Sequence, residues 1–476
     1  MTDAVDVAVI GAGAAGLQIA AIAAGLGLRV ALAERGRMGG THLNTGCIPA
    51  KALSAAAKAA AGIRDARRFG IHLPPPEIDW TQIRAHVQGA IARAAPNAAA
   101  ARLHGMGVEV VAAAAHFVAP DEIEAGTRRI RFRRCVIAAG SAPVVPNIPG
   151  LTDIPWLTNE TLFDLVDPPG HLAILGGGQV GLEMAQAHAR LGCLVTLIEP
   201  ARIAAREDAE LADGLRDALA ADGVTLREGV GLARVARDGE GVALELTDGS
   251  RFGATHLLLA VGRAPRLASL DLVAGKVQAT ERGVATDAGL RSLSNPRVYA
   301  AGDIADPEGI GPWTATHVAT EHAAILARRM LFRLPARLDP AALPRLIGTE
   351  PELAQVGLTE EEARAAGHTE LSILRWPLSE TGRAIADGRP DGMVKLVATP
   401  KGRLLGASLL GAHAGEMAGI YGLMIGRKLP LSALSGLVLP YPVLAEAGKR
   451  AAAEFYTPKL LSPFAKGLVG WLRHLP

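Results

Sequence analysis

A strand–turn–helix–strand pattern with three spaced glycines occurs twice in this chain and constrains its fold more than any other feature. The first copy, VDVAVIGAGAAGLQIAAIAAGLGLRVALAER, has an apolar strand from Val5 to Ile10 and a turn through Gly11, Gly13 and Gly16. In such a turn the first glycine permits the tight bend, the second lets the backbone approach a pyrophosphate, and the third lets helix pack on strand. The pattern predicts a doubly wound α/β domain that binds a dinucleotide.

An acidic residue follows the second strand of this copy. Glu34 is placed to accept hydrogen bonds from a ribose hydroxyl. The phosphates would rest on the helix N-terminus, where free N–H groups and the helix dipole favour an anion. A βαβ unit without nucleotide is the alternative interpretation, but the complete order of strand, turn, helix, strand and acid favours a binding site.

The second copy, HLAILGGGQVGLEMAQAHARLGCLVTLIEP, repeats the glycines at Gly176, Gly178 and Gly181 and ends its second strand at Glu199. Two such units in one chain predict two dinucleotides, one bound tightly and one exchanging. An acid at this position would repel a 2′-phosphate, which favours NADH over NADPH.

Two basic residues leave the nucleotide preference open. Arg202 and Arg206 closely follow Glu199 and could hold a 2′-phosphate instead. We therefore expect NAD(P)H, with NADH favoured, at the second site.

Two later stretches fit the first site. RCVIAAGSAP is an apolar strand that ends in a turn at Gly140, and NPRVYAAGDIAD is a strand that ends at Gly302 and Asp303. A carboxylate after such a turn can reach a ribityl or ribose hydroxyl. Aspartates in turns also commonly cap the next helix, but beside a dinucleotide site we expect Asp303 to be a ligand.

Composition excludes several other classes of protein. The formal net charge of the 476 residues is +2, which gives no strong attraction to nucleic acid. Three cysteines are too few for a disulfide scaffold and suit a reducing cytoplasm. The first residues include acids and show no signal peptide, and no apolar run is long enough to span a membrane. We expect a cytoplasmic protein, at most peripheral to a membrane.

The order of motifs resembles one family along nearly the whole chain. From residue 5 to about 455 the matching stretches are VIGAGAAG, GGTHLNTGCIPAKAL, AAGSAP, LGGGQVGLEMA, AVGRAP, VYAAGDIA, VGLTEEEA, GMVKLV and LLGASLLGAHAGEM. They resemble the pyridine nucleotide-disulfide oxidoreductases, such as dihydrolipoamide dehydrogenase and mercuric reductase.

This resemblance implies an α/β fold with two Rossmann-like nucleotide-binding domains and an α+β dimerisation domain. It divides the chain into an FAD-binding domain (1–150), an NAD(P)-binding domain (151–272), a central domain that completes the FAD site (273–338), a dimerisation domain (339–456) and a tail (457–476). A homodimer is implied with them.

The resemblance also implies roles for individual residues. Lys51 should lie near the flavin N5, where a cation stabilises the anionic reduced flavin, and Glu183 should pair with it near the nicotinamide. Asp303 should bind the ribityl chain. Further cofactor contacts are implied for Gly39, Gly40, Thr41 and, in AVGRAP, Gly262.

One redox cysteine of the family is replaced. In GGTHLNTGCIPAK the flavin-side cysteine is Cys47, but the position that exchanges with a substrate disulfide is His42. Imidazole forms no disulfide, so we do not expect the dithiol–disulfide cycle within one subunit. His42 could favour a Cys47 thiolate, for chemistry or for a metal. We favour the alternative, in which His42 is only a polar replacement for the lost cysteine and contacts water or a flavin carbonyl. We expect no metal site.

The catalytic base of the family is replaced too. The family motif HPTLSE reads YPVLAE here, with Tyr441 at the base position and Glu446 retained. A phenol is a poor base near neutral pH but can donate a hydrogen bond. Cys135 and Cys193 follow apolar patterns and are expected to be inert core thiols. The paired C-terminal cysteines of mercuric reductases are missing, which argues against mercury reduction.

A basic amphipathic segment, TPKLLSPFAKGLVGWLRHLP, follows the last family motif. Apolar residues recur at helical spacing with basic residues between them: Leu461, Phe464, Leu468 and Trp471, and Lys459, Lys466 and Arg473. The segment could lie on a membrane surface. We favour packing against its own subunit or a partner subunit, which is the commoner arrangement in an obligate dimer.

Together these features predict an FAD-dependent NAD(P)H oxidoreductase that passes electrons to a small-molecule, non-disulfide acceptor such as a quinone. A second hypothesis keeps Cys47 in the chemistry, as a single thiol that reduces a peroxide or forms a mixed disulfide. A third is a non-catalytic flavoprotein that senses NADH or binds a partner. The presence of Lys51 and Glu183 counts against the third.

Overall fold

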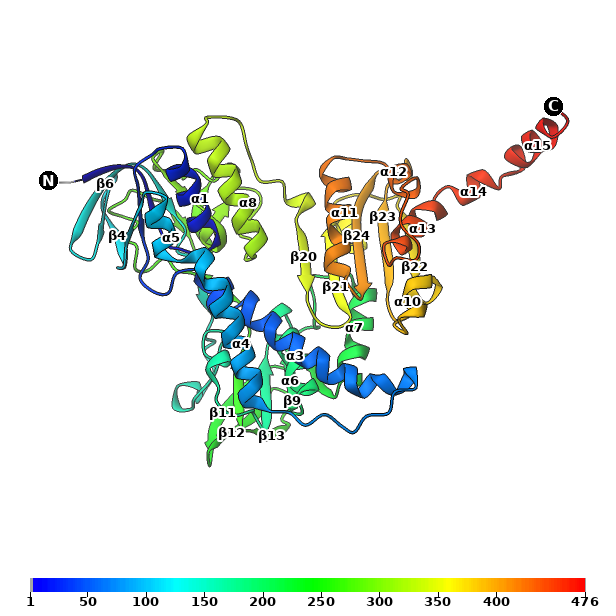
Figure 1. Cartoon of the computed structure of the whole chain (residues 1–476), viewed down its shortest axis with the longest axis horizontal. Helices are drawn as coiled ribbons and strands as arrows, with labels where there is room; N and C mark the ends of the chain where they lie inside the picture. The colour runs from blue at the N-terminus through cyan, green and yellow to red at the C-terminus, as the bar shows by residue number, and fades with distance from the viewer. Residues whose placement is uncertain (1–2, 476) are drawn as a thin grey trace. The chain divides into compact units, whose positions relative to one another are not determined.

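The computed structural model describes residues 3–475 and divides into two compact units (Figure 1). One unit comprises Met1–Ala56, Glu77–Gly176 and Leu232–Leu338, and the other comprises Ala57–Pro76, Gly177–Gly231 and Asp339–Pro476. The fold is α/β, as predicted. The domain boundaries expected from the sequence differ from this division into units and stay a prediction.

The first unit is built on a seven-stranded sheet around the first glycine turn. Its strands lie in the order β3-β2-β1-β6-β5-β4, with β18 also paired to β6. Their bounds are β1 (Asp3–Ile10), β2 (Val30–Ala33), β3 (Val108–Val111), β4 (Ala115–Ala119), β5 (Glu122–Ala125), β6 (Arg128–Ile137) and β18 (Val298–Ala300). Strands β1, β2, β3, β6 and β18 pair in parallel, so their carboxyl ends share one edge, where open α/β sheets bind ligands.

Helices cover this sheet and lead into the candidate site. The helix α1 (Ala14–Gly25) follows β1 directly and packs against α8 (Thr316–Leu326). The remaining helices of this part of the chain are α2 (Gly40–Asn44), α3 (Cys47–Asp65), α4 (Trp80–Ala94) and α5 (Ala100–Gly105). β1 is buried from Val7 to Ile10, because a parallel strand covered on both faces excludes water along its whole length.

Smaller strands complete the first unit. Strands β7 (Ser141–Pro143) and β15 (Arg263–Pro265) form an antiparallel pair, and β8 (His171–Leu175) pairs in parallel with β14 (His256–Leu259). Two three-stranded sheets contain β11 (Leu232–Asp238), β12 (Gly241–Leu246) and β13 (Arg251–Ala254), and β16 (Ala279–Thr280), β17 (Gly283–Thr286) and β19 (Ala305–Pro307).

The second unit contains the other half of the second glycine pattern and an antiparallel sheet. Helix α6 (Gln179–Arg190) leads to β9 (Leu194–Glu199), and α7 (Ala209–Ala221) leads to β10 (Val224–Glu228), which pairs in parallel with β9. The five-stranded sheet has the order β20-β21-β24-β23-β22. Its strands are β20 (Pro344–Ile347), β21 (Glu352–Gly357), β22 (Ser372–Pro377), β23 (Met393–Ala398) and β24 (Leu404–Gly411).

Helices pack on this sheet and form a well-buried core. α11 (Ala414–Gly426) lies against β21 and β24, and α13 (Glu446–Glu454) lies against β22 and β23. The other helices of this part of the chain are α9 (Glu360–Ala365), α10 (Gly382–Ala386), α12 (Leu431–Ser435), α14 (Thr457–Leu460) and α15 (Pro463–Leu472). In the described part of the chain, no helix is long and apolar enough to cross a membrane.

Candidate active site

The first glycine turn has the shape expected of a pyrophosphate site. Gly11 has a φ of 104°, and a Cβ on it would lie 2.4 Å from the Ala138 carbonyl oxygen. A Cβ on Gly16 would lie 1.9 Å from the Gly11 carbonyl oxygen, so the helix can approach the strand only with glycine here. A Cβ on Gly13, by contrast, would meet no atom within 4 Å. Gly13 therefore leaves open space at the start of α1.

Glu34 holds this turn through backbone hydrogen bonds. Its carboxylate accepts from the Ala12 N–H at 2.7 Å and from the Gly36 N–H at 2.8 Å. The first turn of α1 contains no acidic residue, so its N–H groups and dipole favour an anion. Both carboxylate oxygens of Glu34 therefore bind the backbone, and the ribose contact expected for Glu34 stays a prediction.

The segment Gly39–Thr41 lies against the same turn. A Cβ on Gly40 would be only 2.7 Å from the Gly13 Cα, and Gly40 has a φ of 65°. This close approach explains why glycine is required at position 40. The predicted cofactor residues of two distant segments therefore meet at one place.

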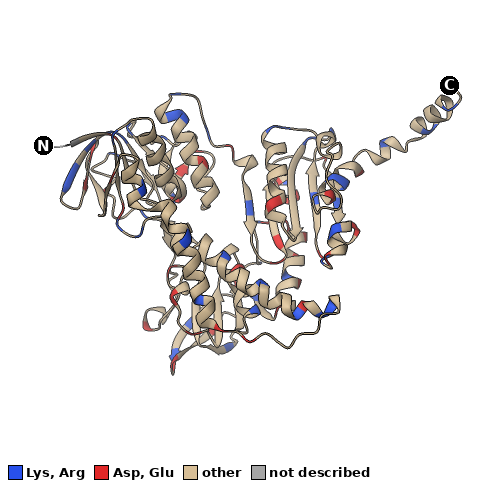
Figure 2. Cartoon of the chain, viewed as in Figure 1, with Lys and Arg blue, Asp and Glu red and all other residues tan. Residues whose placement is uncertain are grey.

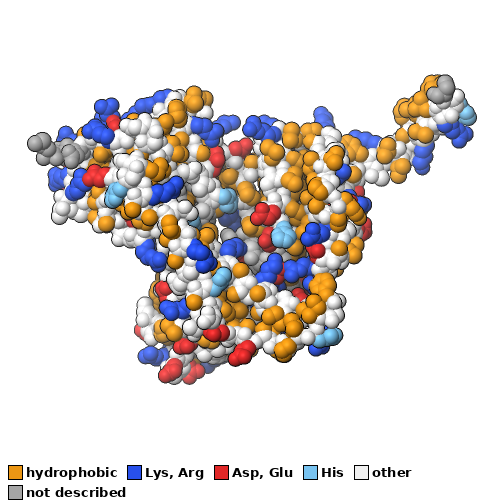
Figure 3. All heavy atoms as spheres, viewed as in Figure 1, with side chains coloured by type: hydrophobic (Ala, Val, Ile, Leu, Met, Phe, Trp, Pro, Cys, Tyr) orange, Lys and Arg blue, Asp and Glu red, His pale blue; other side chains and the backbone are white. Residues whose placement is uncertain are grey.

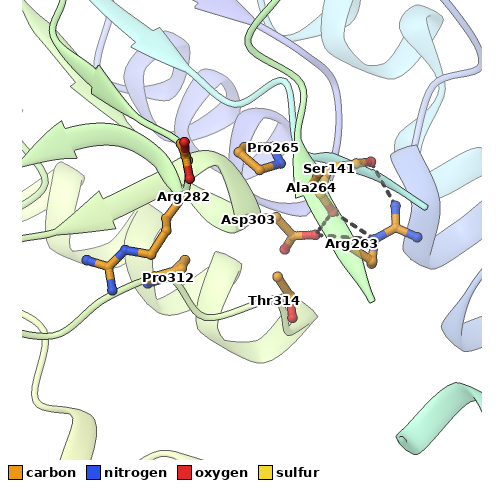
Figure 4. A pocket seen from close by; sticks show the side chains of 9 residues that line it. Ser141, Arg263, Ala264, Pro265, Arg282, Asp303, Pro312 and Thr314 are labelled. Carbon is orange, nitrogen blue, oxygen red and sulfur yellow. Dashed lines mark hydrogen bonds and ion pairs between the residues drawn. The ribbon is translucent and has the colours of Figure 1, made fainter. Parts of the chain in front are cut away.

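Asp303 belongs to a polar cluster beside these turns. The Ser141 hydroxyl donates to the Asp303 carboxylate at 2.5 Å, and the Arg263 Nε lies 3.9 Å from that carboxylate. These residues line a cavity of about 200 Å³ (Figure 4). Arg282 lines the same cavity. The cluster offers a carboxylate and a hydroxyl that can bind sugar-like hydroxyl groups, and the ligand role of Asp303 stays a prediction. The neighbouring turns contain Gly140, Gly262 and Gly302, all with positive φ.

Arg263 connects this cluster to the cysteine segment. Its guanidinium donates to the Ser141 carbonyl oxygen at 2.7 Å and to the Asn159 side-chain oxygen at 2.9 Å. Asn159 in turn donates to the Thr45 carbonyl oxygen at 2.8 Å. Burial lowers the pKa of Arg263. Sequence reasoning missed Arg263, although it stands next to Gly262 in AVGRAP, a motif that the resemblance had already marked.

Cys47 begins α3 and contacts α8. Its Sγ lies 3.3 Å from the Thr316 hydroxyl, and its side chain is exposed. Within residues 3–475 no hydrogen bond joins Cys47 to His42, and burial lowers the pKa of His42, so its imidazole is neutral at neutral pH. The structure gives no support to a Cys47–His42 pair. Lys51 lies one turn further along α3, and its role stays a prediction.

Among the described residues no group of three histidine, cysteine or acidic side chains is arranged to hold a metal ion. Cys135 and Cys193 are both buried. Burial raises the pKa of Cys135 far above its usual range and that of Cys193 to about 11. Both are core thiols, as predicted.

The second glycine pattern repeats the geometry of the first. Gly176 has a φ of 116°, and a Cβ on it would lie 2.4 Å from the Ala260 carbonyl oxygen. A Cβ on Gly178 would meet no atom within 4 Å. Glu199 accepts from the Gly177 N–H at 2.7 Å and from the Ala201 N–H at 2.9 Å. Gly181 is buried in α6. This repeat supports a second dinucleotide site.

Glu183 is held rigidly on α6. It is buried, and its Oε1 accepts from the Gly348 N–H at 2.8 Å and from the Gln179 side chain at 3.2 Å. Gln186, one turn along, accepts from the Glu350 N–H at 2.7 Å. Helix α6 is therefore hydrogen-bonded to the segment from 348 to 350, and this segment holds the Glu183 carboxylate in place.

Of the two arginines that follow Glu199, Arg202 is held by α7 and Arg206 is exposed, so the preference for NADH stays a prediction. Arg202 donates to the Asp213 carboxylate at 3.0 Å and to the Ala209 carbonyl oxygen at 2.9 Å, so it is engaged by α7. We expect NADH to reduce the protein with a kcat/KM about tenfold above that of NADPH. Glu199→Gln, which keeps a hydrogen-bond acceptor but removes the charge, should narrow that ratio. An unchanged ratio in this variant would contradict the role of Glu199.

His322 holds the turn before Asp303. Its Nδ1 accepts from the Gly302 N–H at 3.0 Å, and its Nε2 is buried without a hydrogen-bond partner among the described residues. Burial lowers the pKa of His322 to about 4. The unfolded chain, with a histidine pKa near 6.5, therefore binds more protons below neutrality.

The difference in the pKa of His322 between the folded and the unfolded chain predicts that the folded protein is destabilised by acid. Stability should fall as the pH drops from about 6.5 to about 4, by about 3 kcal/mol in total. His322→Leu should flatten that slope in urea unfolding at several pH values. Three cations, including Arg190, lower the pKa of Glu350 to about 2. Glu350 should therefore make the free energy of unfolding depend on pH only below pH 4.5, so its effect can be separated from that of His322. An unchanged slope in His322→Leu would refute the assignment.

The YPVLAE segment exposes Tyr441 and directs Glu446 to a partner on its own helix. Tyr441 is 75% exposed. The Glu446 carboxylate accepts from Arg450 on its own helix at 2.7 Å. The other oxygen of Glu446 is buried and has no hydrogen-bond partner among the described residues. Glu446 is therefore bound to Arg450, and the catalytic role expected for Tyr441 remains a prediction.

The geometry fits FAD at the first site. Gly13 and the first turn of α1 offer open space and N–H groups to a pyrophosphate, while Asp303 and Ser141 offer acceptors and a donor to hydroxyl groups. The cavity beside them is lined by polar side chains, including Ser141, Arg263 and Asp303.

Comparison with known proteins agrees with this geometry. Residues 5–323 match the family model described as pyridine nucleotide-disulphide oxidoreductase, and residues 343–452 match the model of its dimerisation domain. The chain is 37% identical to a mercuric reductase of Streptomyces lividans, over 94% of this chain and 96% of that protein. It is 35% identical to a dihydrolipoyl dehydrogenase of Thermus scotoductus, with the same two coverages.

Solved structures show the same likeness. The Cu(II) complex of the HOCl-induced flavoprotein disulfide reductase RclA from Escherichia coli has a TM-score of 0.84 at 27% identity, over 94% of this chain and 99% of that one. LpdA from Mycobacterium tuberculosis has a TM-score of 0.86 at 25% identity, with the same coverages. Members of this family use FAD and NAD(P)H, and its dimerisation domain forms homodimers. The chain therefore belongs to the pyridine nucleotide-disulphide oxidoreductase family, as an FAD-dependent, NAD(P)H-linked oxidoreductase.

Proposed function

We propose that this protein transfers electrons from NADH through FAD to a small non-disulfide acceptor, in the first place a quinone. The overall reaction is NADH + H⁺ + quinone → NAD⁺ + quinol. The observation that carries the proposal is the isolation of Cys47: position 42 is histidine, and Cys135 and Cys193 are both buried. A disulfide acceptor would need a second exchanging sulfur that the described residues do not place beside Cys47.

Four groups of predicted site residues have a task in this reaction. FAD held at the first site would supply a carrier for two electrons between the nicotinamide and the acceptor. Gly13 and the N–H groups of α1 hold the pyrophosphate, and Asp303 binds ribityl hydroxyls. Lys51 supplies a positive charge where negative charge develops on reduction. Glu183, fixed by Gly348, orients the nicotinamide end.

His42 suits a carbonyl acceptor better than a disulfide. Burial lowers its pKa, which keeps the imidazole neutral near pH 7. A neutral imidazole has one N–H donor and one acceptor nitrogen. It can donate a hydrogen bond to a quinone oxygen, but it cannot replace the sulfur of a disulfide exchange.

Mercuric ion, which the names of several relatives suggest, is disfavoured as the acceptor. Soft metal ions bind best to paired thiolates. In the part of the chain that the structure describes, Cys47 is the one exposed cysteine, and no three ligating side chains gather around a metal position. A quinone needs no such ligands.

A single-thiol reaction of Cys47 is the second candidate, favoured by its exposure and its contact with the Thr316 hydroxyl. In this reaction the thiolate attacks a peroxide, the O–O bond breaks, and an alcohol leaves as sulfenic acid forms. Two electrons and a proton, supplied by NADH through FAD, then regenerate the thiolate and release the sulfenic oxygen as water.

Substitution of Cys47 separates the two candidates. In Cys47→Ser we expect the steady-state rate of NADH oxidation with a water-soluble quinone to stay within about twofold of the unchanged protein, because no sulfur takes part. Loss of quinone turnover in Cys47→Ser would contradict the first proposal. A peroxidase rate that vanishes with Cys47→Ser would support the second. Cys193→Ser serves as the control for replacing a thiol outside the site.

The proposal includes a location. We place the protein in the cytoplasm, in peripheral contact with a membrane through its C-terminal tail, because a lipid-soluble quinone is met at that surface. The expectation that the tail packs on its own chain is wrong, since none of its described residues is buried. Packing on a partner subunit stays a prediction.

A further inference from the structure

The C-terminal segment from 457 to 475 exposes its apolar side chains. It contains the helices α14 and α15, and neither has a buried residue. Eight large apolar side chains are between 44% and 80% exposed: Leu460, Leu461, Phe464, Leu468, Val469, Trp471, Leu472 and Leu475. Exposed apolar surface of this density marks an interaction site rather than an ordinary protein surface.

Apolar and basic side chains take different faces of α15. At 100° per residue, Phe464, Leu468 and Trp471 fall within an arc of about 60°. Lys466 falls on the opposite side, and Arg473, which directly follows the helix, is seven residues further on and shares that face. Lys459 adds a third positive charge in the neighbouring helix α14. Figure 3 shows orange and blue side chains on different sides of this helix.

The segment contains no acid to balance these charges. From residue 455 to 475 there is no aspartate or glutamate, and Figure 2 shows blue without red along α14 and α15. Two copies of the segment would therefore repel each other. The matched dimerisation domain ends at residue 452, before α14 begins. These facts disfavour a second copy and favour an anionic occupant.

We propose that residues 457–475 are a peripheral anchor for an anionic lipid bilayer. The face with Phe464 and Trp471 enters the boundary between head groups and acyl chains, and the face with Lys466 contacts anionic head groups. The purpose of the anchor rests on the proposed function, since a quinone acceptor is dissolved in that bilayer. The anchor itself stands on the exposure and charge of the segment.

Vesicle co-sedimentation of the FAD-loaded full chain tests the anchor. We expect binding to vesicles of phosphatidylcholine with phosphatidylglycerol, weaker binding to phosphatidylcholine alone, and release as salt is raised, because salt screens the head-group charge. Leu468→Glu with Trp471→Glu should weaken binding to both vesicles at least about tenfold. Lys466→Glu with Arg473→Glu should weaken binding to the anionic vesicles alone.

Matched controls come from exposed residues elsewhere. Val273→Glu and Arg237→Glu make the same changes at an exposed apolar and an exposed basic position and should leave vesicle binding unchanged. No binding of the unchanged protein to anionic vesicles would overturn the anchor. So would a dimer that dissociates in the Leu468→Glu, Trp471→Glu variant, because the face would then cover a second subunit.

The same variants keep the two proposals distinct. Turnover of a water-soluble quinone should be equal in the unchanged protein and in all tail variants. If that turnover is absent while the vesicles still bind, the quinone proposal fails and the anchor stands. If turnover is present and no vesicle binds, the anchor fails alone.

Discussion

Gly13→Val is expected to give a folded protein that is purified without FAD. A Cβ at position 13 would meet no protein atom within 4 Å, and the residue has a φ of −79° and a ψ of −170°, which valine adopts readily. The chain therefore tolerates the side chain. The space that it fills is the one left open for a pyrophosphate, so we expect a loss of FAD affinity of at least about 100-fold.

The control lies on the same helix. Gly25 is exposed at the end of α1, and a Cβ there would also meet no atom within 4 Å. Gly25→Val should keep its flavin absorbance, and circular dichroism should show that both variants are folded. A yellow Gly13→Val protein with the full flavin content would show that the pyrophosphate passes elsewhere.

Lys51→Met is expected to retain FAD but to lose most of its rate of reduction by NADH. The cation at position 51 is predicted to stabilise the negative charge that develops on reduction, and removal of one such group costs about 100-fold to 1,000-fold in rate. Anaerobic stopped-flow absorbance of the flavin would measure this rate. KM for NADH should change less than kcat, because the charge acts during reduction.

Lys58 provides the matched control, two helical turns along α3. It pairs with Glu350 at 3.1 Å, and Glu350 keeps Arg190 as a partner when Lys58 is replaced. In Lys58→Met, NADH should therefore reduce the flavin at nearly the rate measured for the unchanged protein. Equal rates in Lys51→Met and the unchanged protein would remove Lys51 from the reaction.

Local patterns in the sequence predicted the nucleotide turns well. The spacing of Gly11, Gly13 and Gly16 fixes how a strand, turn and helix can pack, and the structure has that packing. The acid that follows each second strand joins its own turn, as seen for Glu34 and Glu199. The two acid contacts span 22 residues each, a range that spacing along the chain can show, whereas the close approaches of Ala138 to Gly11 and of Ala260 to Gly176 come from the fold.

Long-range polar contacts could not be predicted in the same way. Arg263 meets Asn159 and Ser141 across more than 100 residues, and no local pattern marks such partners. His322 is only 20 residues from Gly302, but it lies in an ordinary helical stretch with no motif to mark it as the partner of the Gly302 N–H. The amphipathic tail could be recognised from its spacing, but its exposure depends on what the rest of the chain leaves uncovered.

The central claim is that flavin, with no disulfide beside it, is the redox centre that NADH reduces. His42→Cys supplies a direct comparison, because it restores the cysteine pair that the family resemblance implies. The decisive measurement is an anaerobic titration of both proteins with NADH, followed by flavin absorbance. We predict complete bleaching of the unchanged protein at one NADH per flavin and uptake of a second NADH by His42→Cys. A second equivalent taken up by the unchanged protein, or a long-wavelength band on reduction, would contradict the claim and bring Cys47 into the reaction.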